Sequence, residues 1–320
     1  MGFDRNAADD QAFGHKPVLL DECLEALDIK PEGIYLDGTL GRAGHSLEIA
    51  KRLTTGRLIC LDRDETAIEA AKIRLADYKD RVTLVHSNFS RIADVLRELD
   101  IGGVDGMLFD LGVSSPQLDE ADRGFSYMHD APLDMRMDRT AALTARDVVN
   151  DWSYEDLRRI LFEYGEERYA PAIAKAIVSR RQESPIETTG QLVGIIRGAM
   201  PPAALREKQH PAKRSFQAIR IAVNDELGEL PPMLKGAAEL LHPGGRLAVI
   251  SFHSLEDRII KKTLQELATG CTCPPNFPVC VCGKKPKMKL VSRKPIVAGE
   301  AELVYNPRAR SAKLRVAEKL

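Results

Sequence analysis

Short apolar runs alternate with helix-like stretches over the first third of the chain. In these stretches apolar residues recur every three or four positions, which is typical of an amphipathic helix. The apolar runs lie at 33–36, 57–61, 82–86 and 104–109, and the helix-like stretches at 45–53, 65–75 and 91–99. Strands that alternate with helices predict a parallel sheet with right-handed crossovers and helices on both faces. The sequence therefore predicts an α/β fold with a doubly wound sheet.

The pattern changes after residue 112. An irregular stretch runs from 113 to 138, and its aromatic and methionine residues favour an ordered functional loop over disorder. Helical periodicity without any strand signal then continues to residue 199. We interpret residues 131–210 as an all-helical domain inserted into the sheet.

The alternation of strands and helices returns in the last third. Helices are predicted at 215–230, 234–241 and 255–267, a buried strand at 246–252, a final strand at 312–317 and a weaker one at 290–297. The predicted organisation is a first part of the core at 1–130, a helical substrate-recognition domain at 131–210, and a second part of the core at 211–320.

A polar or aromatic residue follows each of the first four predicted strands. These residues are Asp37, Asp62, Phe89 and Asp110. Because the carboxyl ends of parallel strands meet at one edge, where such sheets bind ligands, we expect the four side chains to lie close together. Four such residues at one edge are harder to explain by packing than any one of them alone.

A glycine-rich loop follows the first predicted strand. Gly38, Gly41 and Gly44 precede a helix with the spacing G-x-x-G-x-x-G, so backbone amides and a helix N-terminus can approach a ligand. The dinucleotide pattern G-x-G-x-x-G has a glycine where this chain has Thr39 or Leu40. The loop suits a nucleoside-like ligand without a diphosphate, such as S-adenosylmethionine, although similar loops also serve packing alone.

Two acids near the end of the second strand suit different roles. In dinucleotide-binding folds an acid at this place accepts hydrogen bonds from ribose hydroxyls, whereas an acid just before a helix caps its N-terminus. Asp64 directly precedes the predicted helix at 65–75. We therefore assign the cap to Asp64 and the ribose to Asp62.

Charge is distributed unevenly along the 320 residues. The formal net charge is −1, but residues 283–320 hold 11 Lys or Arg and 3 Glu, a net +8, which leaves −9 for the rest. A basic tail indicates contact with a polyanion such as nucleic acid, although a solvated surface explains it as well. No apolar run reaches 18 residues and residues 1–10 hold no signal core, so we expect a cytoplasmic protein without a membrane partner.

The six cysteines fall into two groups. Cys23 and Cys60 lie in apolar stretches and are predicted to be buried thiols. The others form two Cys-x-Cys pairs, namely Cys271, Cys273, Cys280 and Cys282. Zinc, an ordinary reduced loop and a redox-labile loop all remain open for these pairs, and we assign no metal ligand.

Several long motifs resemble those of the bacterial 16S rRNA (cytosine-N4) methyltransferases. They are Asp37-Gly-Thr-Leu-Gly-Arg-Ala-Gly-His-Ser46, Asp110-Leu-Gly-Val-Ser-Ser-Pro-Gln-Leu118, Arg123-Gly-Phe-Ser, Pro132-Leu-Asp-Met-Arg-Met-Asp138, Ser215-Phe-Gln-Ala-Ile-Arg-Ile-Ala-Val-Asn-Asp-Glu-Leu227, Ser251-Phe-His-Ser-Leu-Glu-Asp-Arg258 and Asn306-Pro-Arg-Ala-Arg-Ser311. The resemblance implies a class I methyltransferase core, a Rossmann-like doubly wound sheet with a helical insertion. It also implies methyl transfer from S-adenosylmethionine to the N4 amine of a cytidine in the decoding region of the small ribosomal subunit, and it suggests a homodimer.

The resemblance also implies roles for residues at matching positions. The cofactor-binding set is Ala43, Gly44, His45, Asp62, Phe89, Asp110 and Gln117. In this set Phe89 packs on the adenine ring, unless it is only a core residue.

Cytosine N4 is a poor nucleophile because its lone pair is delocalised, so a methyltransferase must align the amine and accept a proton or hydrogen bond from it. Asp110 is the predicted catalytic acceptor. Phe125 or Tyr127 is predicted to stack on the base, with loop anchoring as the alternative for both rings, and Lys213 and Arg214 are predicted to contact RNA phosphates.

Two rival functions use the same pattern. A nicotinamide-dependent oxidoreductase shares the sheet and the ribose acid, but the missing glycine counts against it. A non-catalytic RNA-binding assembly factor would keep the fold without turnover, and the apparently complete cofactor set argues against that.

Overall fold

The computed structural model describes residues 17–273, 279 and 282–320, which form two compact units. One unit comprises Met1–Gly112 with Leu227–Leu320, and the other comprises Val113–Glu226. No helix of the described residues is both long enough and apolar enough to cross a membrane.

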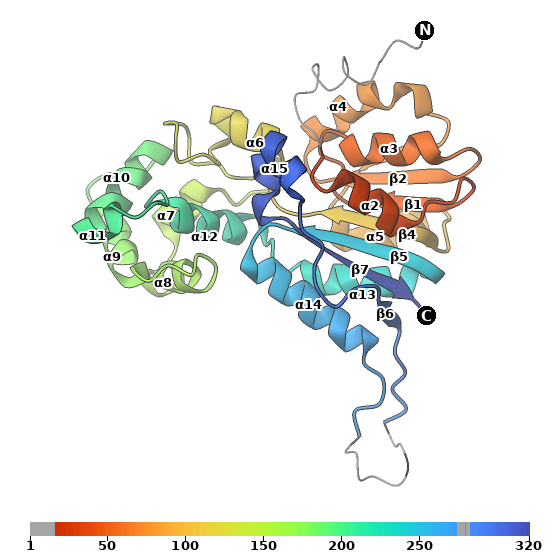
Figure 1. The fold of residues 1–320 in the computed structure, drawn as a ribbon. Coiled ribbons are helices and arrows are strands. Elements are labelled where there is room, and N and C mark those ends of the chain that lie inside the picture. The colour runs from red at the N-terminus through yellow and green to blue at the C-terminus, as the bar shows by residue number, and fades with distance from the viewer. Residues whose placement is uncertain (1–16, 274–278, 280–281) are drawn as a thin grey trace. The chain divides into compact units, whose positions relative to one another are not determined.

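The first unit contains a seven-stranded sheet in the order β3-β2-β1-β4-β5-β7-β6 (Figure 1). The strands are β1 Ile34–Asp37, β2 Arg57–Asp62, β3 Val82–His86, β4 Val104–Asp110, β5 Leu241–Ser251, β6 Met288–Leu290 and β7 Lys313–Lys319. Strands β1 to β5 pair in parallel, whereas β7 pairs antiparallel with both β5 and β6. The predicted doubly wound sheet of the class I methyltransferase type is confirmed, with an antiparallel edge.

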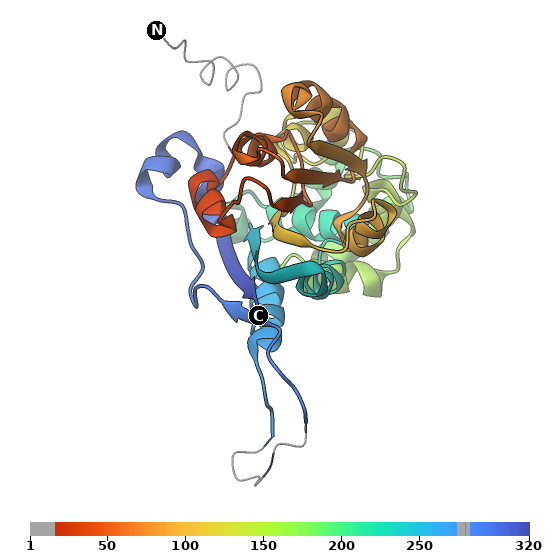
Figure 2. The ribbon, with the colours of Figure 1, turned by 90° about the vertical axis from the view of Figure 1, so that its right-hand side faces the viewer.

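Helices cover both faces of this sheet. They are α2 Leu20–Leu27, α3 Gly44–Arg52, α4 Glu65–Arg74, α5 Ile92–Glu98, α13 Leu230–Leu240, α14 Ser254–Ala268 and α15 Glu300–Tyr305, with short 3-10 helices η1 Ala76–Tyr78, η2 Phe89–Arg91 and η4 Pro307–Ser311. The cluster on one face joins α2, α3 and α4 to the sheet, and the cluster on the other joins α5, α13 and α14. Figure 2 shows α2 and α15 side by side, where the Leu19 amide donates to Glu302 Oε1 at 3.0 Å.

Alternation within the strands explains how one sheet serves two cores. Successive side chains of a strand point to opposite faces. In β4, Met107 and Phe109 enter the cluster with α5, whereas Leu108 enters the cluster with α2. Because both faces are buried, the strands consist of nearly continuous apolar residues, which is the pattern that the sequence shows.

The second unit is all-helical. It contains α6 Ser115–Asp119, η3 Ala121–Arg123, α7 Ala145–Asp151, α8 Tyr154–Glu163, α9 Ala170–Arg181, α10 Thr189–Ala199, α11 Pro202–Leu205 and α12 Lys213–Asn224. Its limits of 113 and 226 lie outside the expected 131 and 210 because Phe125, before this range, and Phe216, after it, belong to its apolar core.

Two element predictions need correction. The helix expected at 215–230 is too long, because α12 ends at Asn224, where Asp225 adopts a left-handed conformation (φ 47°), and the next helix, expected at 234–241, begins at Leu230 as α13. The strand expected at 290–297 reduces to β6, which ends at Leu290, and a single bridge between Ile296 and Leu314. The expected final strand is confirmed as β7.

Replacing Gly38 with alanine should destabilise the protein. A Cβ at Gly38 would lie 2.2 Å from the ring of Phe109, which is fully buried. Such overpacking costs about 1–3 kcal/mol. Urea unfolding should show this loss for Gly38→Ala, whereas Gly102→Ala, where no atom lies within 4 Å of the added Cβ, serves as the matched control. Equal stability of the two variants would contradict the packing role of Gly38.

Candidate active site

Acidic side chains gather at the carboxyl edge of the sheet, as predicted. Asp37, Asp62 and Asp110 are the last residues of β1, β2 and β4, and the parallel pairing brings these strand ends to one edge, where Asp37 lies opposite Cys60 and Leu108. Figure 1 shows the neighbouring ends of β1, β2 and β4 in the sheet. The edge therefore carries three carboxyl groups that arrive from separate parts of the sequence.

The glycines of the first loop are explained by packing and backbone geometry. Gly38 lies against Phe109, and a Cβ at Gly44 would lie 2.4 Å from Pro17 Cγ. Gly41 has a φ of +49°, and Ala43 reaches the same left-handed region with a φ of 57°. The backbone therefore turns sharply here, and α3 begins at Gly44 without a side-chain cap. The amide groups of its first turn therefore have no partner within the helix.

Both oxygen atoms of Asp62 accept hydrogen bonds from backbone amides, and one of these bonds holds the first loop. Oδ2 accepts from the Gly41 amide at 2.8 Å, and Oδ1 accepts from the Asp64 amide at 2.8 Å. Burial raises the pKa of Asp62, and these two hydrogen bonds oppose the rise. Asp64 caps α4 by accepting from the Thr66 amide at 3.1 Å, which confirms its predicted role.

Asp37 is almost fully buried behind the loop. Its Oδ2 accepts from the Ser46 hydroxyl at 2.6 Å, and its Oδ1 accepts from the Thr39 amide at 3.1 Å. Burial raises the pKa of Asp37 to about 6 despite these bonds. Neither Ser46 nor Thr39 stands at a strand end, so the pattern of polar residues after the strands does not identify them.

Asp110 is the most perturbed carboxyl group of the edge. Burial raises the pKa of Asp110 to about 8, and the nearby charges of Asp37 and Glu256 add to the shift. Its backbone amide donates to Thr39 Oγ1 at 2.5 Å, while its side chain remains 26% exposed. Oδ1 has no hydrogen-bond partner among the described residues. The side chain is thus held in place and partly exposed, whereas Oδ1 is itself buried and has no hydrogen-bond partner among the described residues.

His45 faces Asp110 as a neutral ring. Its Nε2 lies 3.0 Å from the carbonyl oxygen of Val18, which can only accept, so Nε2 carries the proton and Nδ1 keeps a lone pair. Nδ1 is 3.9 Å from Asp110 Oδ2. Burial lowers the pKa of His45 to about 4, so the ring adds no positive charge to the edge at neutral pH.

Phe89 lies in the core at this edge. Its ring is 8% exposed and meets Phe109 edge-on, with centroids 6.1 Å apart, and the Arg63 guanidinium lies 5.6 Å from its centroid. Arg63 and Asn88 are both held by Glu229 of the α13 N-cap, at 3.1 Å and 2.6 Å. The core interpretation of Phe89 is thus supported, and its contact with adenine stays a prediction.

The first turn of α14, which follows β5, contributes an acid to which the sequence analysis assigns no role. Glu256 is buried, and its Oε2 accepts from the amides of Phe252 and His253 at 2.8 and 3.2 Å. The pattern His253-x-x-Glu256 is a capping box at the start of α14. In the sequence, this pattern directly after the predicted strand at 246–252 is the signal that could have identified Glu256.

The remaining predicted residues belong to the helical unit. Gln117 is 5% exposed, and its Oε1 accepts from the Ser114 amide at 3.0 Å within a capping box of α6. Phe125 is 5% exposed in the helical core, so it presents no stacking face in this structure. Lys213 and Arg214 are exposed at the start of α12.

Tyr127 is already part of an aromatic stack. Its ring stacks on His210, with centroids 4.5 Å apart and planes 12° apart, and meets Phe216 edge-on at 5.7 Å. This arrangement favours loop anchoring, and stacking on a nucleobase stays a prediction.

The acidic edge suits a cationic ligand. Three carboxyl groups with raised pKa values are stabilised in their charged form when a positive charge arrives, whereas a diphosphate would meet repulsion. Together with the strand order and its antiparallel edge, this defines a class I methyltransferase that uses S-adenosylmethionine.

Comparison with known proteins places the chain more narrowly. It belongs to the MraW methylase family, whose profile matches residues 12–320. It is 57% identical to the ribosomal RNA small subunit methyltransferase H of Brevibacillus brevis, over 97% of this chain and 99% of that protein. It is 59% identical to the protein of the same description from Symbiobacterium thermophilum, over 97% of this chain and 98% of that one. A solved structure, a putative rRNA-methylase from Clostridium thermocellum, is 12% identical with a TM-score of 0.45, and covers 96% of this chain and 99% of its own.

The contribution of Asp110 to the free energy of unfolding should fall as the pH rises from about 4 to about 8 and level off above that. The folded state keeps a proton on Asp110 up to pH 8, whereas an ordinary aspartate loses it near pH 4. Asp110→Asn mimics the protonated group, so the variant should be more stable than the wild type at pH 8, with a difference that shrinks towards pH 5. The slope should approach about 1.4 kcal/mol per pH unit in urea unfolding. The exposed Asp77, replaced by Asn, is the control, and a pH-independent difference for Asp110→Asn would contradict the shift.

Proposed function

We propose that this methyltransferase transfers a methyl group to the exocyclic N4 amine of a cytidine in 16S rRNA of the small ribosomal subunit, in the cytoplasm. Support comes from the extended identity to relatives described as ribosomal RNA small subunit methyltransferase H, and from the motifs that resemble the cytosine-N4 family. The observation that carries the chemistry is the buried Oδ1 of Asp110 at the acidic edge, which no residue that the structure describes engages in a hydrogen bond.

Residues at the end of the first loop and at the end of β2 fit S-adenosylmethionine. S-adenosylmethionine supplies an electrophilic methyl group on a positively charged sulfur when it is bound. Ala43, Gly44 and His45 offer the uncapped start of α3 to its carboxylate, and Asp62 offers acceptors to its ribose. The three carboxyl groups of the edge favour the positive charge. A nicotinamide cofactor, with its diphosphate, fits this edge poorly.

Asp110 then acts on the amine of the cytosine. A carboxylate oxygen of Asp110 accepts a hydrogen bond from N4, which orients the amine and increases the electron density on nitrogen. In the ligand-free protein a pKa of about 8 keeps Asp110 mostly protonated at neutral pH. A positive charge bound beside it lowers this pKa, so Asp110 becomes a carboxylate when the donor is present and can take the proton that N4 loses.

The helical unit and a basic hollow of the first unit, between α14 and β7, are proposed to bind the RNA. Lys213, Arg214 and Tyr127 in the helical unit stay our predictions for direct RNA contacts.

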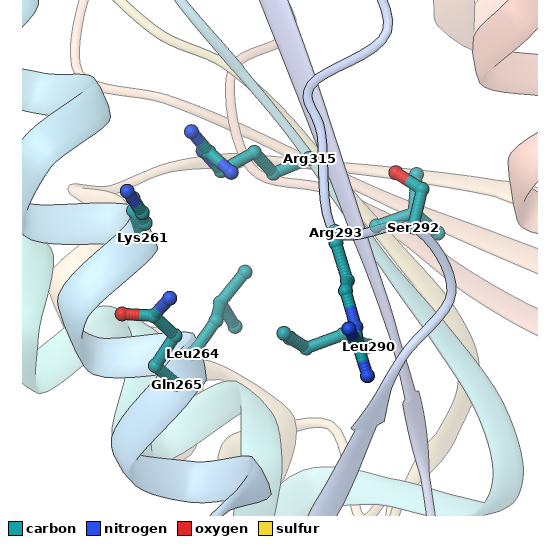
Figure 3. Close-up of a pocket in the computed structure, with 8 residues that line it drawn as sticks. Lys261, Leu264, Gln265, Leu290, Ser292, Arg293 and Arg315 are labelled. Atoms are coloured by element: carbon teal, nitrogen blue, oxygen red, sulfur yellow. The ribbon is translucent and has the colours of Figure 1, made fainter.

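A separate hollow lies between α14 and β7, lined by Lys261, Leu264, Gln265, Leu290, Ser292, Arg293, Arg315 and Val316 (Figure 3). In the close-up, Lys261 projects from α14 and Arg293 lies across the hollow from it. Arg315 is paired with Asp257 at 2.7 Å, whereas Lys261 and Arg293 have no ion-pair partner among the described residues. This surface suits RNA phosphates.

Methyl transfer should depend strongly on Asp110. In a single-turnover assay with labelled S-adenosylmethionine and small subunits that lack the modification, the wild type should label one cytidine at N4, and Asp110→Asn should be about 100-fold slower or worse. Calorimetry should show that the variant still binds the cofactor. The wild-type kcat/KM for the cofactor should rise with pH up to about 8 and reach a plateau above it, and the variant should lack this rise.

Near-normal turnover of Asp110→Asn would contradict the acceptor role. Cofactor binding without any methyl incorporation into subunits or rRNA would instead favour the non-catalytic assembly factor.

RNA affinity should depend on salt through the basic hollow. Replacing both Lys261 and Arg293 with alanine should lower the slope of log K against log salt by about 0.7 for each phosphate that these cations neutralise in the wild type. Lys72→Ala, which removes a cation paired with Glu69 on α4, is the matched control. An unchanged slope in the double variant would contradict a role for this surface in RNA binding.

A further inference from the structure

Three cysteines lie close together beyond the end of α14. The Sγ atoms of Cys271, Cys273 and Cys282 all lie within 4.8 Å of one another, and those of Cys271 and Cys282 are 3.7 Å apart. A disulfide would bring two sulfurs to about 2.05 Å. The cluster therefore consists of thiols that converge without being joined by a disulfide.

The separation of the sulfurs matches a tetrahedral zinc site. Zinc binds cysteine sulfur at about 2.3 Å, so two thiolates on one tetrahedral ion lie about 3.8 Å apart. The pair Cys271 and Cys282, at 3.7 Å, has this spacing. Thiolates are soft ligands that select zinc over magnesium or calcium. Cys280, which pairs with Cys282 in the sequence, lies outside the described residues, and the other three fill three of the four positions of the ion.

The surroundings favour the thiolate form that a metal requires. The Cys273 amide donates to Cys271 Sγ at 3.4 Å, an interaction that orients a sulfur and stabilises negative charge on it. Three cations, Lys284, Lys285 and Lys287, follow the cluster directly in the sequence. Positive charges near a cysteine favour its thiolate.

The two arms that carry the cysteines have little else to hold them. They leave α14 and return to β6 side by side (Figures 1 and 2), joined where the Lys287 amide donates to the Leu267 carbonyl at 2.8 Å. Residues 282–287 are all exposed, so within the described residues no apolar core fixes this arm, and Lys287 adds an exposed ion pair with Glu239 of α13. Small exposed segments of this kind are usually held by a metal or by disulfides.

We propose that Cys271, Cys273 and Cys282 bind a structural Zn²⁺ that clamps the two arms between α14 and β6. The site is separate from the acidic edge of the sheet, and the inference does not depend on the reaction proposed above. Its role is to hold the arms in one arrangement, because the ion replaces the missing apolar contacts.

Metal content tests this directly on the full-length protein. Protein purified under reducing conditions without chelator should contain about one zinc per chain, as measured by inductively coupled plasma mass spectrometry. Cys271→Ser and Cys282→Ser should each retain less than about a tenth of this zinc. Cys23→Ala, which removes a buried thiol of α2 far from the cluster in sequence, should retain all of it. Replacement by Co²⁺ should add a thiolate-to-cobalt charge-transfer band that Cys271→Ser lacks.

Protection of the arms gives an independent readout. Chelation of the zinc should increase trypsin cleavage after Lys284 and Lys287 by about tenfold or more, while circular dichroism and cofactor binding stay unchanged. Wild-type protein without metal, full zinc retention by Cys271→Ser, or a native Cys271–Cys282 disulfide in freshly lysed cells would each overturn the proposal.

Discussion

The convergence of carboxyl groups at one edge of the sheet is the constraint around which the first unit is organised. Asp37, Asp62 and Asp110 occupy positions where burial opposes their charge. A buried carboxylate is tolerated when hydrogen bonds offset the loss of water. The amides of Thr39 and Gly41 supply such bonds, so the shape of the loop and the charge of the edge depend on each other.

The hydrogen bonds at this edge also distinguish Asp110, our proposed acceptor, from Asp37 and Asp62, which hold the backbone around the site. The oxygens of Asp37 and Asp62 accept hydrogen bonds from the first loop and its helix or from the Asp64 amide. Asp110 keeps one oxygen without a partner in the described part of the chain. Its raised pKa makes it responsive to a positive charge nearby, because a cation stabilises the carboxylate more than the acid. In the proposed reaction, binding of a cationic donor would thereby activate the acceptor.

The two units contribute different groups: the first carries the acids at the sheet edge, and the second carries the aromatic residues of the helical core. The sheet positions the acids through strand register, and the helical unit begins directly after β4 ends, at Val113. Its aromatic residues are largely committed to its own core: Phe125 is buried and Tyr127 is stacked on His210. The described parts of the arms beyond α14 are a third feature, in which residues 282–287 are exposed and three thiols converge.

The sequence by itself determined the alternation of strands and helices, the acids at the strand ends and the cap at Asp64, because these depend on local periodicity and on the geometry of parallel strands. Tertiary structure alone decided where α12 ends, that Phe125 belongs to the helical core, and that Thr39, Ser46 and Glu256 surround the acids. It also decided which charges shift the pKa of Asp110, since this pKa depends on burial and on Asp37 and Glu256, which are distant in the sequence. Such long-range contacts leave no periodic trace, because they arise only when separate elements pack together.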